Sequence, residues 1–310
     1  MLSSLTVIAK VNYHTYVCNC KKYSINPITN FKIMKDKIVI VTGANTGMGR
    51  VTALELAKKG AHVIMICRNK STGEATQEEI IKLSGNKNID LLIADLSVQQ
   101  SVKELAGKIN AKYQHIDVLV NNAGLALTNY SETKDGIETT FATNVLSMYM
   151  ISILLLDKLK KSTAGRIVNI ASSTHTGAKV NWEDIGYKKK YKLFDAYNQS
   201  KLCNIVLTYE LAKRLKDTNI TVNCLNPGPV KTELARDMGA LFKFIGKLFF
   251  LTPEKASETA IYLASSPDVN GVTGKYFAKC RSIASSKTSM DAEVGKKLWD
   301  LCAKMTHTDL

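Results

Sequence analysis

The chain has 310 residues, of which 45% are hydrophobic, and a formal net charge of +15 at pH 7. The hydrophobic fraction argues against extensive disorder, and the length suits one large α/β domain or two smaller ones. The charge favours anionic partners, namely nucleic acid, an acidic membrane surface or a phosphorylated cofactor. No helix-turn-helix, zinc-finger or RNA-binding motif accompanies it, so we expect no nucleic-acid partner and no metal centre.

Residues 1–34 are expected to form an N-terminal extension. A short apolar run gives way to polar and basic residues, and no acidic residue occurs before Asp36. This composition is compatible with a targeting or membrane-proximal leader and equally with a loosely ordered extension. No stretch of eighteen or more apolar residues occurs, so no transmembrane helix of ordinary length is expected.

From residue 35 onward, short apolar runs alternate with amphipathic segments. Strands are predicted at 37–43, 61–67, 89–96, 116–124, 165–173 and 220–228, and helices at 47–60, 72–85, 98–110, 138–162 and 195–215. Alternation at this spacing is typical of a parallel sheet covered by helices on both faces. We therefore predict a single α/β domain over 35–310 with a doubly wound, Rossmann-type sheet.

A glycine-rich turn follows the first predicted strand in "TGANTGMGR". Gly43, Gly47 and Gly49 have the spacing G-x-x-x-G-x-G, with Asn45, Thr46 and Met48 between them. Glycines permit a tight turn and close approach of the backbone to a pyrophosphate, which then sits at the N-terminus of the next helix. The position between strand and helix predicts a dinucleotide site.

The second predicted strand indicates which dinucleotide binds. It ends in "MICRNK", which places Arg68 and Asn69 where an NAD-selective site usually has an acidic residue. A guanidinium presents a planar fork of donors that suits the 2′-phosphate of NADP. We predict NADP(H), with NAD the less favoured cofactor; the alternative is that Arg68 only covers the sheet edge.

Small and polar residues follow the third and fourth strands. Asp95 is expected to bond the adenine amine, with the Leu96 backbone assisting, and Asn122, Ala123 and Gly124 would let the cofactor lie against the sheet. Each would be an ordinary turn alone. In this series each falls at the carboxyl end of a strand, where ligands of open α/β sheets bind.

The motifs, taken together, resemble those of the short-chain dehydrogenase/reductase family. "TGANTGMG", "NNAG", "ATNV", "IVNIASS", "YNQSK" and "NPGPVKTE" occur in the family's order. Longer phrases such as "AYNQSKLCNIVLTYELAKRL" are similar to the retinol dehydrogenase-like branch. That resemblance implies NADPH-dependent reduction of retinaldehyde or of other lipid aldehydes and ketones.

Tyr197 and Lys201 would carry the proton chemistry and also contact the cofactor. A phenol with a pKa near 10 is a poor proton donor at neutral pH, but Lys201 lies one helical turn away on the same face. We expect its ammonium to lower the pKa of Tyr197, so that the phenol can protonate a developing alkoxide.

Two further catalytic residues are implied by the resemblance. Ser172, with Ser173 as its neighbouring candidate, aligns with the serine that holds the substrate oxygen. Asn144 aligns with the asparagine that bends its helix and holds a water connecting the lysine to solvent. The last cofactor contacts, to the nicotinamide, also follow from the family order: Pro227, Gly228, Val230 and Thr232.

Two segments are expected to shape the substrate site. The stretch between Ser172 and Tyr197 is long and either borders the substrate or only decorates the surface. A substrate lid is predicted around 233–255, in which residues 240–251 combine aromatic side chains with Lys243 and Lys247. This apolar piece is a lid, a membrane contact or a plain core helix.

The predicted function is thus an NADPH-dependent oxidoreductase that interconverts a small apolar carbonyl and its alcohol. The alternative is an NADPH-binding sensor or scaffold without turnover, which the four competent catalytic positions disfavour. A homo-oligomer and a membrane-surface contact are candidate associations. The cysteine pattern favours an intracellular, reducing compartment, either the cytoplasm or the surface of the endoplasmic reticulum or another organelle.

Overall fold

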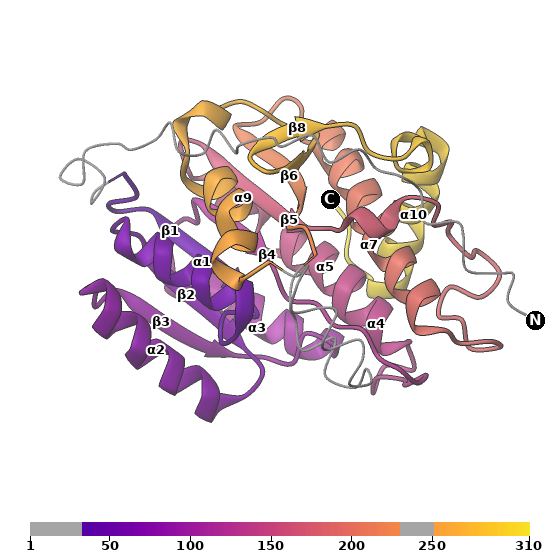
Figure 1. Ribbon diagram of the computed structural model, residues 1–310, viewed down its shortest axis with the longest axis horizontal. Coiled ribbons are helices and arrows are strands. Elements are labelled where there is room, and N and C mark those ends of the chain that lie inside the picture. The colour runs from indigo at the N-terminus through magenta and orange to yellow at the C-terminus, as the bar shows by residue number, and fades with distance from the viewer. Residues whose placement is uncertain (1–32, 230–250) are drawn as a thin grey trace, which may run out of the picture.

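The computed structural model describes residues 33–229 and 251–310, which form a twisted sheet between two layers of helices (Figure 1). The sheet has eight strands in the order β3-β2-β1-β4-β5-β6-β7-β8, all parallel except β8, which runs antiparallel to β7. The strands are β1 (Ile38–Thr42), β2 (His62–Cys67), β3 (Ile89–Ile93), β4 (Val118–Asn121), β5 (Gly165–Ile170), β6 (Ile220–Asn226), β7 (Lys275–Ala278) and β8 (Arg281–Ile283). The predicted doubly wound sheet is confirmed.

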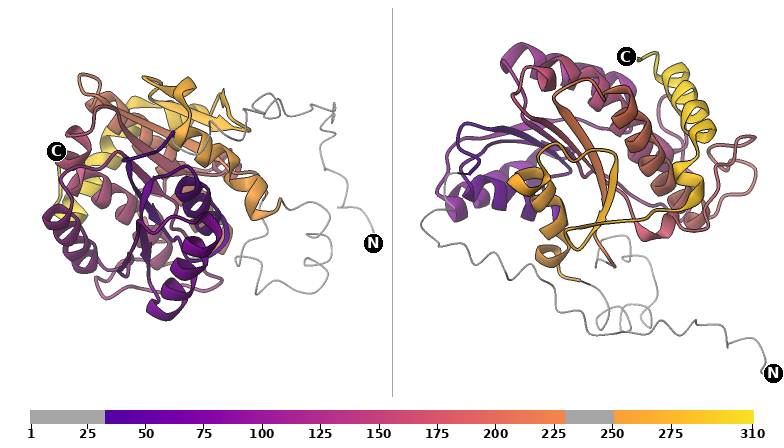
Figure 2. Two further views of the ribbon diagram at one scale, coloured as in Figure 1. Left: turned by 90° about the vertical axis from the view of Figure 1, so that its left-hand side faces the viewer. Right: turned by 90° about the horizontal axis from the view of Figure 1, so that it is seen from above.

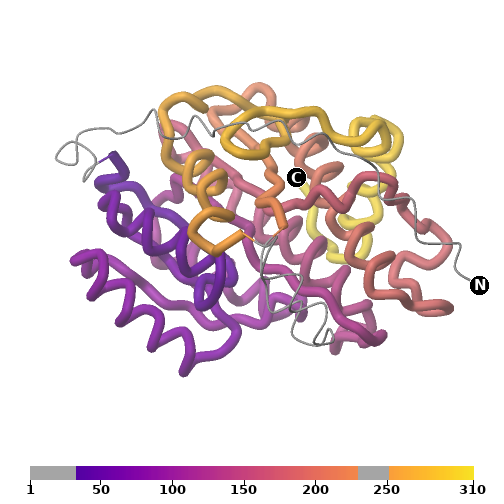
Figure 3. Tube along the Cα trace, in the orientation of Figure 1, coloured from indigo at the N-terminus to yellow at the C-terminus, as the bar shows by residue number. Residues whose placement is uncertain are grey.

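Helices cover both faces of the sheet (Figure 2). Those described are α1 (Gly47–Lys58), α2 (Lys70–Ser84), α3 (Gln99–Lys112), α4 (Thr139–Phe141), α5 (Ser147–Leu154), α6 (Leu156–Lys160), α7 (Leu193–Arg214), α9 (Pro253–Ser265) and α10 (Ala292–Thr306). The first and last parts of the chain meet where α9 lies beside α1, as the trace in Figure 3 shows. The crossover between β1 and β4 leaves a crevice at the carboxyl ends of the strands, the place where such sheets bind ligands.

Alternate residues of each central strand enter different cores. Ile40 and Ile64 pack with α3, α5, α7 and α10, whereas Val39 and Val63 pack with α1, α2 and α9. Side chains alternate across a strand, so a strand buried on both faces needs an unbroken apolar run. This explains why "KIVIVT" and "AHVIMIC" lack the polar alternation of half-exposed strands.

The single long helix predicted for 138–162 is wrong in detail. The segment is α4, a π-helical turn over Ala142–Leu146, then α5 and α6, with a break at Leu155. The side chain of Asn144, in the centre of the π turn, is fully engaged with the backbone of Leu125 and with Ser200. A π turn is rare and often marks a functional site.

The C-terminal helix α10 fastens α7 against the sheet. The Trp299 ring is 1% exposed, lies 4.2 Å from the Arg214 guanidinium and meets Tyr149 edge-on at 4.9 Å. The Trp299 indole N–H also donates to Asp309 at 2.9 Å. Because α7 carries Tyr197 and Lys201, this anchoring supports the site from behind.

Several predicted features lie outside the described residues. They are nearly all of the 1–34 extension and most of the 233–255 lid, including the segment with Lys243 and Lys247. Within residues 33–229 and 251–310, no helix combines the length and apolarity needed to cross a membrane.

Candidate active site

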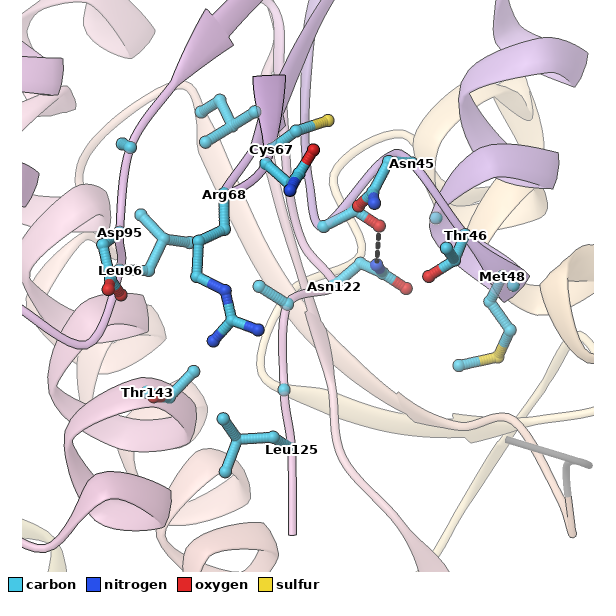
Figure 4. Close-up of a pocket in the computed structure, with 18 of the residues that line it drawn as sticks. Asn45, Thr46, Met48, Cys67, Arg68, Asp95, Leu96, Asn122, Leu125 and Thr143 are labelled. Carbon is cyan, nitrogen blue, oxygen red and sulfur yellow. Dashed lines mark hydrogen bonds between the residues drawn. The ribbon is translucent and has the colours of Figure 1, made fainter. Parts of the chain in front are cut away.

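A pocket of about 640 Å³ opens at the carboxyl ends of β1 to β4 (Figure 4). It is lined by every residue predicted for the dinucleotide along these four strands: Gly43, Asn45, Thr46, Gly47, Met48, Gly49, Arg68, Asn69, Asp95, Leu96, Asn122, Ala123 and Gly124. The lining also includes Ile66, Cys67, Ala94, Leu125, Ala126, Thr143 and Pro253, which sequence reasoning did not single out.

The glycine turn needs its glycines for two different reasons. Gly43 and Gly47 have φ of +64° and +52°, a region that side chains rarely adopt. Gly49 is buried, and a Cβ there would lie 2.1 Å from the carbonyl oxygen of Gly43. The N-terminus of α1 therefore approaches the pocket with bare backbone, the arrangement that binds a pyrophosphate.

The fourth strand braces this turn. The Asn122 side-chain amide donates to the carbonyls of Thr42 and Gly43 at 2.8 and 3.2 Å. In return, the Thr42 hydroxyl accepts from the backbone N–H groups of Asn122 and Ala123, both at 2.9 Å. These bonds hold the β1–α1 turn and the end of β4 in one rigid wall.

We expect Gly49→Ala to weaken dinucleotide binding more than about tenfold and to lower the free energy of unfolding by about 1–3 kcal/mol, because the new methyl group overpacks the turn. Fluorescence titration and urea denaturation measure the two effects. Gly107→Ala is the matched control, since a Cβ there meets nothing within 4 Å. Equal dinucleotide affinity for the two variants would contradict the close approach of the backbone to the cofactor.

The end of β2 presents a cation to the pocket. Arg68 is exposed and its side chain extends from β2 into the pocket, between Asp95 and Asn122 (Figure 4). Asn69 caps α2, whose first turn has no acidic residue, by accepting from the Thr72 N–H at 3.0 Å. A phosphate near Arg68 would thus meet a guanidinium and a helix N-terminus together.

Asp95 and Thr143 line the far side of the pocket. Asp95 Oδ1 is engaged by the N–H and hydroxyl of Ser97, at 3.0 and 2.7 Å. The Thr143 hydroxyl is buried and has no hydrogen-bond partner among the described residues. Because this oxygen has almost no accessible surface, Thr143 lines the pocket with its other atoms.

Three predicted catalytic side chains meet beside the pocket. Ser172, two residues after β5, lies near enough to the Tyr197 phenol for its hydroxyl to lower the pKa of Tyr197. The Lys201 ammonium lies 5.5 Å from the centre of the Tyr197 ring and donates to the Ile170 carbonyl at 3.1 Å. The Ser172 hydroxyl also accepts from the Thr174 N–H at 3.2 Å, so its own proton is available to the phenolic oxygen.

Asn144 connects this group to the pocket wall. Its Oδ1 accepts from the Leu125 N–H, and its Nδ2 donates to the Leu125 carbonyl, both at 2.8 Å, and to the Ser200 hydroxyl at 2.9 Å. A Cβ added to Gly124 would lie 3.3 Å from Asn144 Oδ1 and 3.5 Å from Lys201 Nζ. The amide and the ammonium thus flank the same bare stretch of backbone.

Burial acts on both members of the Tyr197 and Lys201 pair. It raises the pKa of Tyr197 to about 12, against a smaller lowering by the nearby Ser172 hydroxyl. Burial also lowers the pKa of Lys201 to about 8. The protein's own groups therefore do not shift the Tyr197 pKa in the predicted direction, because the ammonium is itself desolvated and is engaged with Ile170.

The long stretch between Ser172 and Tyr197 is tied to α7. The Asn181 N–H donates to Gln199 Oε1 at 2.7 Å, and Gln199 Nε2 donates to the Ile185 carbonyl at 2.8 Å. Lys297 of α10 stacks on Trp182 at 4.4 Å. These contacts fix the stretch beside the helix turn that carries Tyr197.

The predicted nicotinamide contacts are only partly described. Gly228 has φ of +87° and its N–H donates to Asn226 Oδ1 at 3.0 Å, so "NPG" forms a tight turn after β6. Pro227 and Gly228 are not among the residues that line the pocket. Val230 and Thr232 lie outside the described residues.

A pocket at the crossover of a doubly wound sheet, with a tyrosine, a lysine and a serine beside it, is the arrangement of a dinucleotide-dependent oxidoreductase. The family model of the short chain dehydrogenases matches residues 37–240. The chain belongs to this family, and to its retinol dehydrogenase-like branch.

Relatives and solved structures agree with this assignment. The chain is 38% identical to retinol dehydrogenase 14 of Mus musculus over 88% of this chain and 86% of that protein. It is 38% identical to retinol dehydrogenase 13 of Homo sapiens over 87% and 84%. A short chain dehydrogenase from Shigella flexneri, crystallised with NADP, superimposes with a TM-score of 0.67 and 25% identity, over 81% of this chain and all of that one.

Proposed function

We propose that this oxidoreductase is an NADPH-dependent carbonyl reductase acting on retinal-like or other lipid aldehydes and ketones. The observation that carries the proposal is the proximity of the Ser172 hydroxyl to the Tyr197 phenol, with the Lys201 ammonium beside the ring and the pocket adjoining. A phenol and a hydroxyl that face the same position can both donate hydrogen bonds to a carbonyl oxygen placed there.

The pocket fits the cofactor by its own geometry. Gly49 leaves the backbone bare, and Arg68 supplies charge for a ribose 2′-phosphate. Bound there, the dinucleotide would supply the hydride. The relative crystallised with NADP supports this choice of cofactor.

The chain's own residues would handle the oxygen and the proton. Ser172 would donate a hydrogen bond to the substrate oxygen, which raises the electrophilicity of the carbonyl carbon. Tyr197 would give its phenolic proton to the alkoxide, while Lys201 stabilises the phenolate that remains. Asn144, bonded to Ser200 and Leu125, would hold the helix turn that faces Lys201.

The apolar substrate class rests on the curated relatives, which are named retinol dehydrogenases. The stretch between Ser172 and Tyr197 and the predicted 233–255 lid would border that substrate. Buried thiols at Cys203, Cys224 and Cys302 support a reducing, intracellular compartment. Contact of residues 240–251 with a membrane surface and assembly into homo-oligomers are the candidate associations of this protein.

The test is NADPH oxidation, followed by absorbance, with all-trans-retinal and a panel of lipid aldehydes. We expect turnover with NADPH and an NADH activity that is weaker by about tenfold or more. Tight NADPH binding without turnover on the panel would favour the sensor alternative. Absence of NADPH binding would contradict the cofactor assignment itself.

Arg68→Ala should raise the KM for NADPH by about 10–100-fold, since a hydrogen bond to a charged group is worth about 1.5–3 kcal/mol. The KM for NADH should change by less than about threefold because NADH lacks the phosphate. Lys70→Ala, which removes a neighbouring exposed cation that does not line the pocket, is the matched control. If both variants raised the KM for NADPH equally, the general positive charge near the pocket, and not the Arg68 guanidinium, would be the cause.

A further inference from the structure

His175 occupies an unusual position behind the proposed substrate serine. It ends the short 3₁₀ turn Ser173–His175, and its side chain is 3% exposed. Its Nδ1 lies 2.7 Å from the Ser172 carbonyl oxygen, and its Nε2 lies 3.1 Å from the Ser286 backbone N–H. The ring also meets Tyr276 of β7 edge-on, with the centroids 5.1 Å apart.

These two contacts determine the protonation of the ring. A backbone N–H can only donate, so Nε2 must carry a lone pair, and a carbonyl can only accept, so Nδ1 must carry the proton. The histidine is therefore neutral and in the Nδ1–H tautomer. Burial lowers its pKa, in agreement with a neutral ring.

The group that holds the far side of the ring is itself fixed. Ser286 lies between β8 and α10, and its neighbour Ser285 is bonded by Ser289 Oγ at 2.7 Å and by the Tyr209 hydroxyl at 2.8 Å. Tyr209 belongs to α7. His175 thus joins the turn after β5 to a segment more than a hundred residues later, which α7 holds in place.

We propose that His175 is a positioning residue that fixes Ser172 for catalysis, by holding its carbonyl from Nδ1 while Ser286 holds the ring at Nε2. The inference rests on the proposed role of Ser172. The Ser172 carbonyl accepts a hydrogen bond from His175 Nδ1, and the Ser172 hydroxyl accepts one from the Thr174 N–H. The direction of the hydroxyl toward Tyr197 therefore depends on both hydrogen bonds. A misplacement of about 1 Å can cost about 10²-fold in rate.

A buried histidine that only fills space would behave differently. Its replacement would lower stability and leave the kcat of the remaining folded protein unchanged. The experiment must therefore separate kcat from stability and from NADPH binding.

The first test compares His175→Phe with His175→Asn. The Phe variant keeps an aromatic ring but loses both polar contacts of the imidazole. In the Asn variant the amide nitrogen can take the place of Nδ1 and donate to the Ser172 carbonyl. We expect His175→Phe to lower kcat about 10–100-fold with the NADPH dissociation constant within about threefold of wild type. His175→Asn should recover at least about tenfold of that loss. A kcat for His175→Phe within about threefold of wild type, or equal kcat values for the two variants, would overturn the proposal.

The second test leaves His175 in place. Ser286 has φ of −68°, which suits proline, so Ser286→Pro removes the N–H donor to Nε2, and Ser286→Ala retains it. Both variants lose the bond from the Ser289 N–H to the Ser286 hydroxyl, at 3.3 Å. We expect a kcat for Ser286→Pro at least about fivefold below that of Ser286→Ala; equal values would overturn the coupling.

The third test needs no variant. The ¹⁵N spectrum of the wild-type histidines should show one ring in the Nδ1–H tautomer at neutral pH, and an Nε2–H or doubly protonated ring at His175 would overturn the proposal. Failure of the proposed function is distinguishable from failure of this inference. In the first case, wild type and Tyr197→Phe are equally inactive; in the second, wild type turns over and His175→Phe does too.

Discussion

Tyr197→Phe should lower kcat for carbonyl reduction by about 10²–10⁴-fold, the range typical for loss of a general acid. The phenol is the only group of the proposed set that lies against Ser172 and can release a proton to an alkoxide. Phenylalanine keeps the ring that packs beside Lys201, so the NADPH dissociation constant should stay within about threefold of wild type. Stopped-flow kinetics and fluorescence titration measure the two quantities.

Tyr113→Phe is the matched control for this experiment. Its hydroxyl bonds Asp90 on β3, and it does not line the pocket, so kcat should stay within about threefold of wild type. A Tyr197→Phe variant that retains more than about a tenth of the wild-type kcat would contradict the acid role.

The pKa of Tyr197 also predicts how each direction responds to pH. Because burial raises it to about 12, the phenol stays protonated at neutral pH, the form that reduction requires. The rate of reduction should therefore be nearly flat from about pH 6 to about pH 8, where Lys201 begins to lose its proton. Alcohol oxidation needs the phenolate and should rise with pH over the same interval.

Periodicity in the sequence was sufficient for the central sheet but not for its edges. The strands β1 to β6 follow from apolar runs because they are buried on both faces, as Ile40 and Val39 illustrate. The antiparallel β8 is three exposed residues long and carries no such run. Its pairing with β7 depends on the turn at Lys279 and Cys280, which have φ of +50° and +59° and would not be expected there from residue type.

The site was predictable where a motif stands at the end of a strand. Arg68 and Asn122 were found this way. Thr143 was missed because it lies in a π turn, and a helical periodicity of 3.6 residues does not predict which residues of such a turn line a pocket. Pro253 was missed for another reason. Thr252 and Pro253 mark a helix start in the sequence, but only the fold brings that start to the β1–α1 turn.

The pairing of His175 with Ser286 could not be predicted from the sequence either. The spacing in the sequence does not identify a partner for a lone histidine after a strand, and the N–H donor lies 111 positions away. Long-range contacts of this kind depend on how α7 and β7 pack, which no local pattern encodes.

Lys201→Met should abolish most reductase activity and yet make the protein more stable at neutral pH. Burial lowers the pKa of Lys201 from 10.5 to about 8, so below that pH the folded protein carries a charged ammonium that water would solvate better. At about 1.4 kcal/mol per pKa unit, the cost approaches about 3 kcal/mol. Methionine has a similar shape without the charge, and the Ile170 carbonyl keeps the Asn204 amide as a donor, at 3.2 Å. We expect the unfolding free energy to rise by about 1–3 kcal/mol at pH 7.

The pH dependence separates this explanation from a general effect of methionine. Below about pH 8 the lysine is protonated in both the folded and the unfolded chain, so its cost is complete and constant. Between about pH 8 and the pKa of 10.5 of the unfolded chain, the folded state binds fewer protons, so wild-type stability rises with pH and the advantage of Lys201→Met should disappear.

Lys213→Met, on the exposed side of α7, should change the stability by less than about 0.5 kcal/mol at every pH. If Lys201→Met were instead destabilised at pH 7, the ammonium would have to be stabilised by its surroundings, and the desolvation that we assign to this site would be wrong. A gain in stability together with a loss of about 10²–10⁴-fold in kcat would mean that the fold bears the cost of a buried cation for the sake of the reaction.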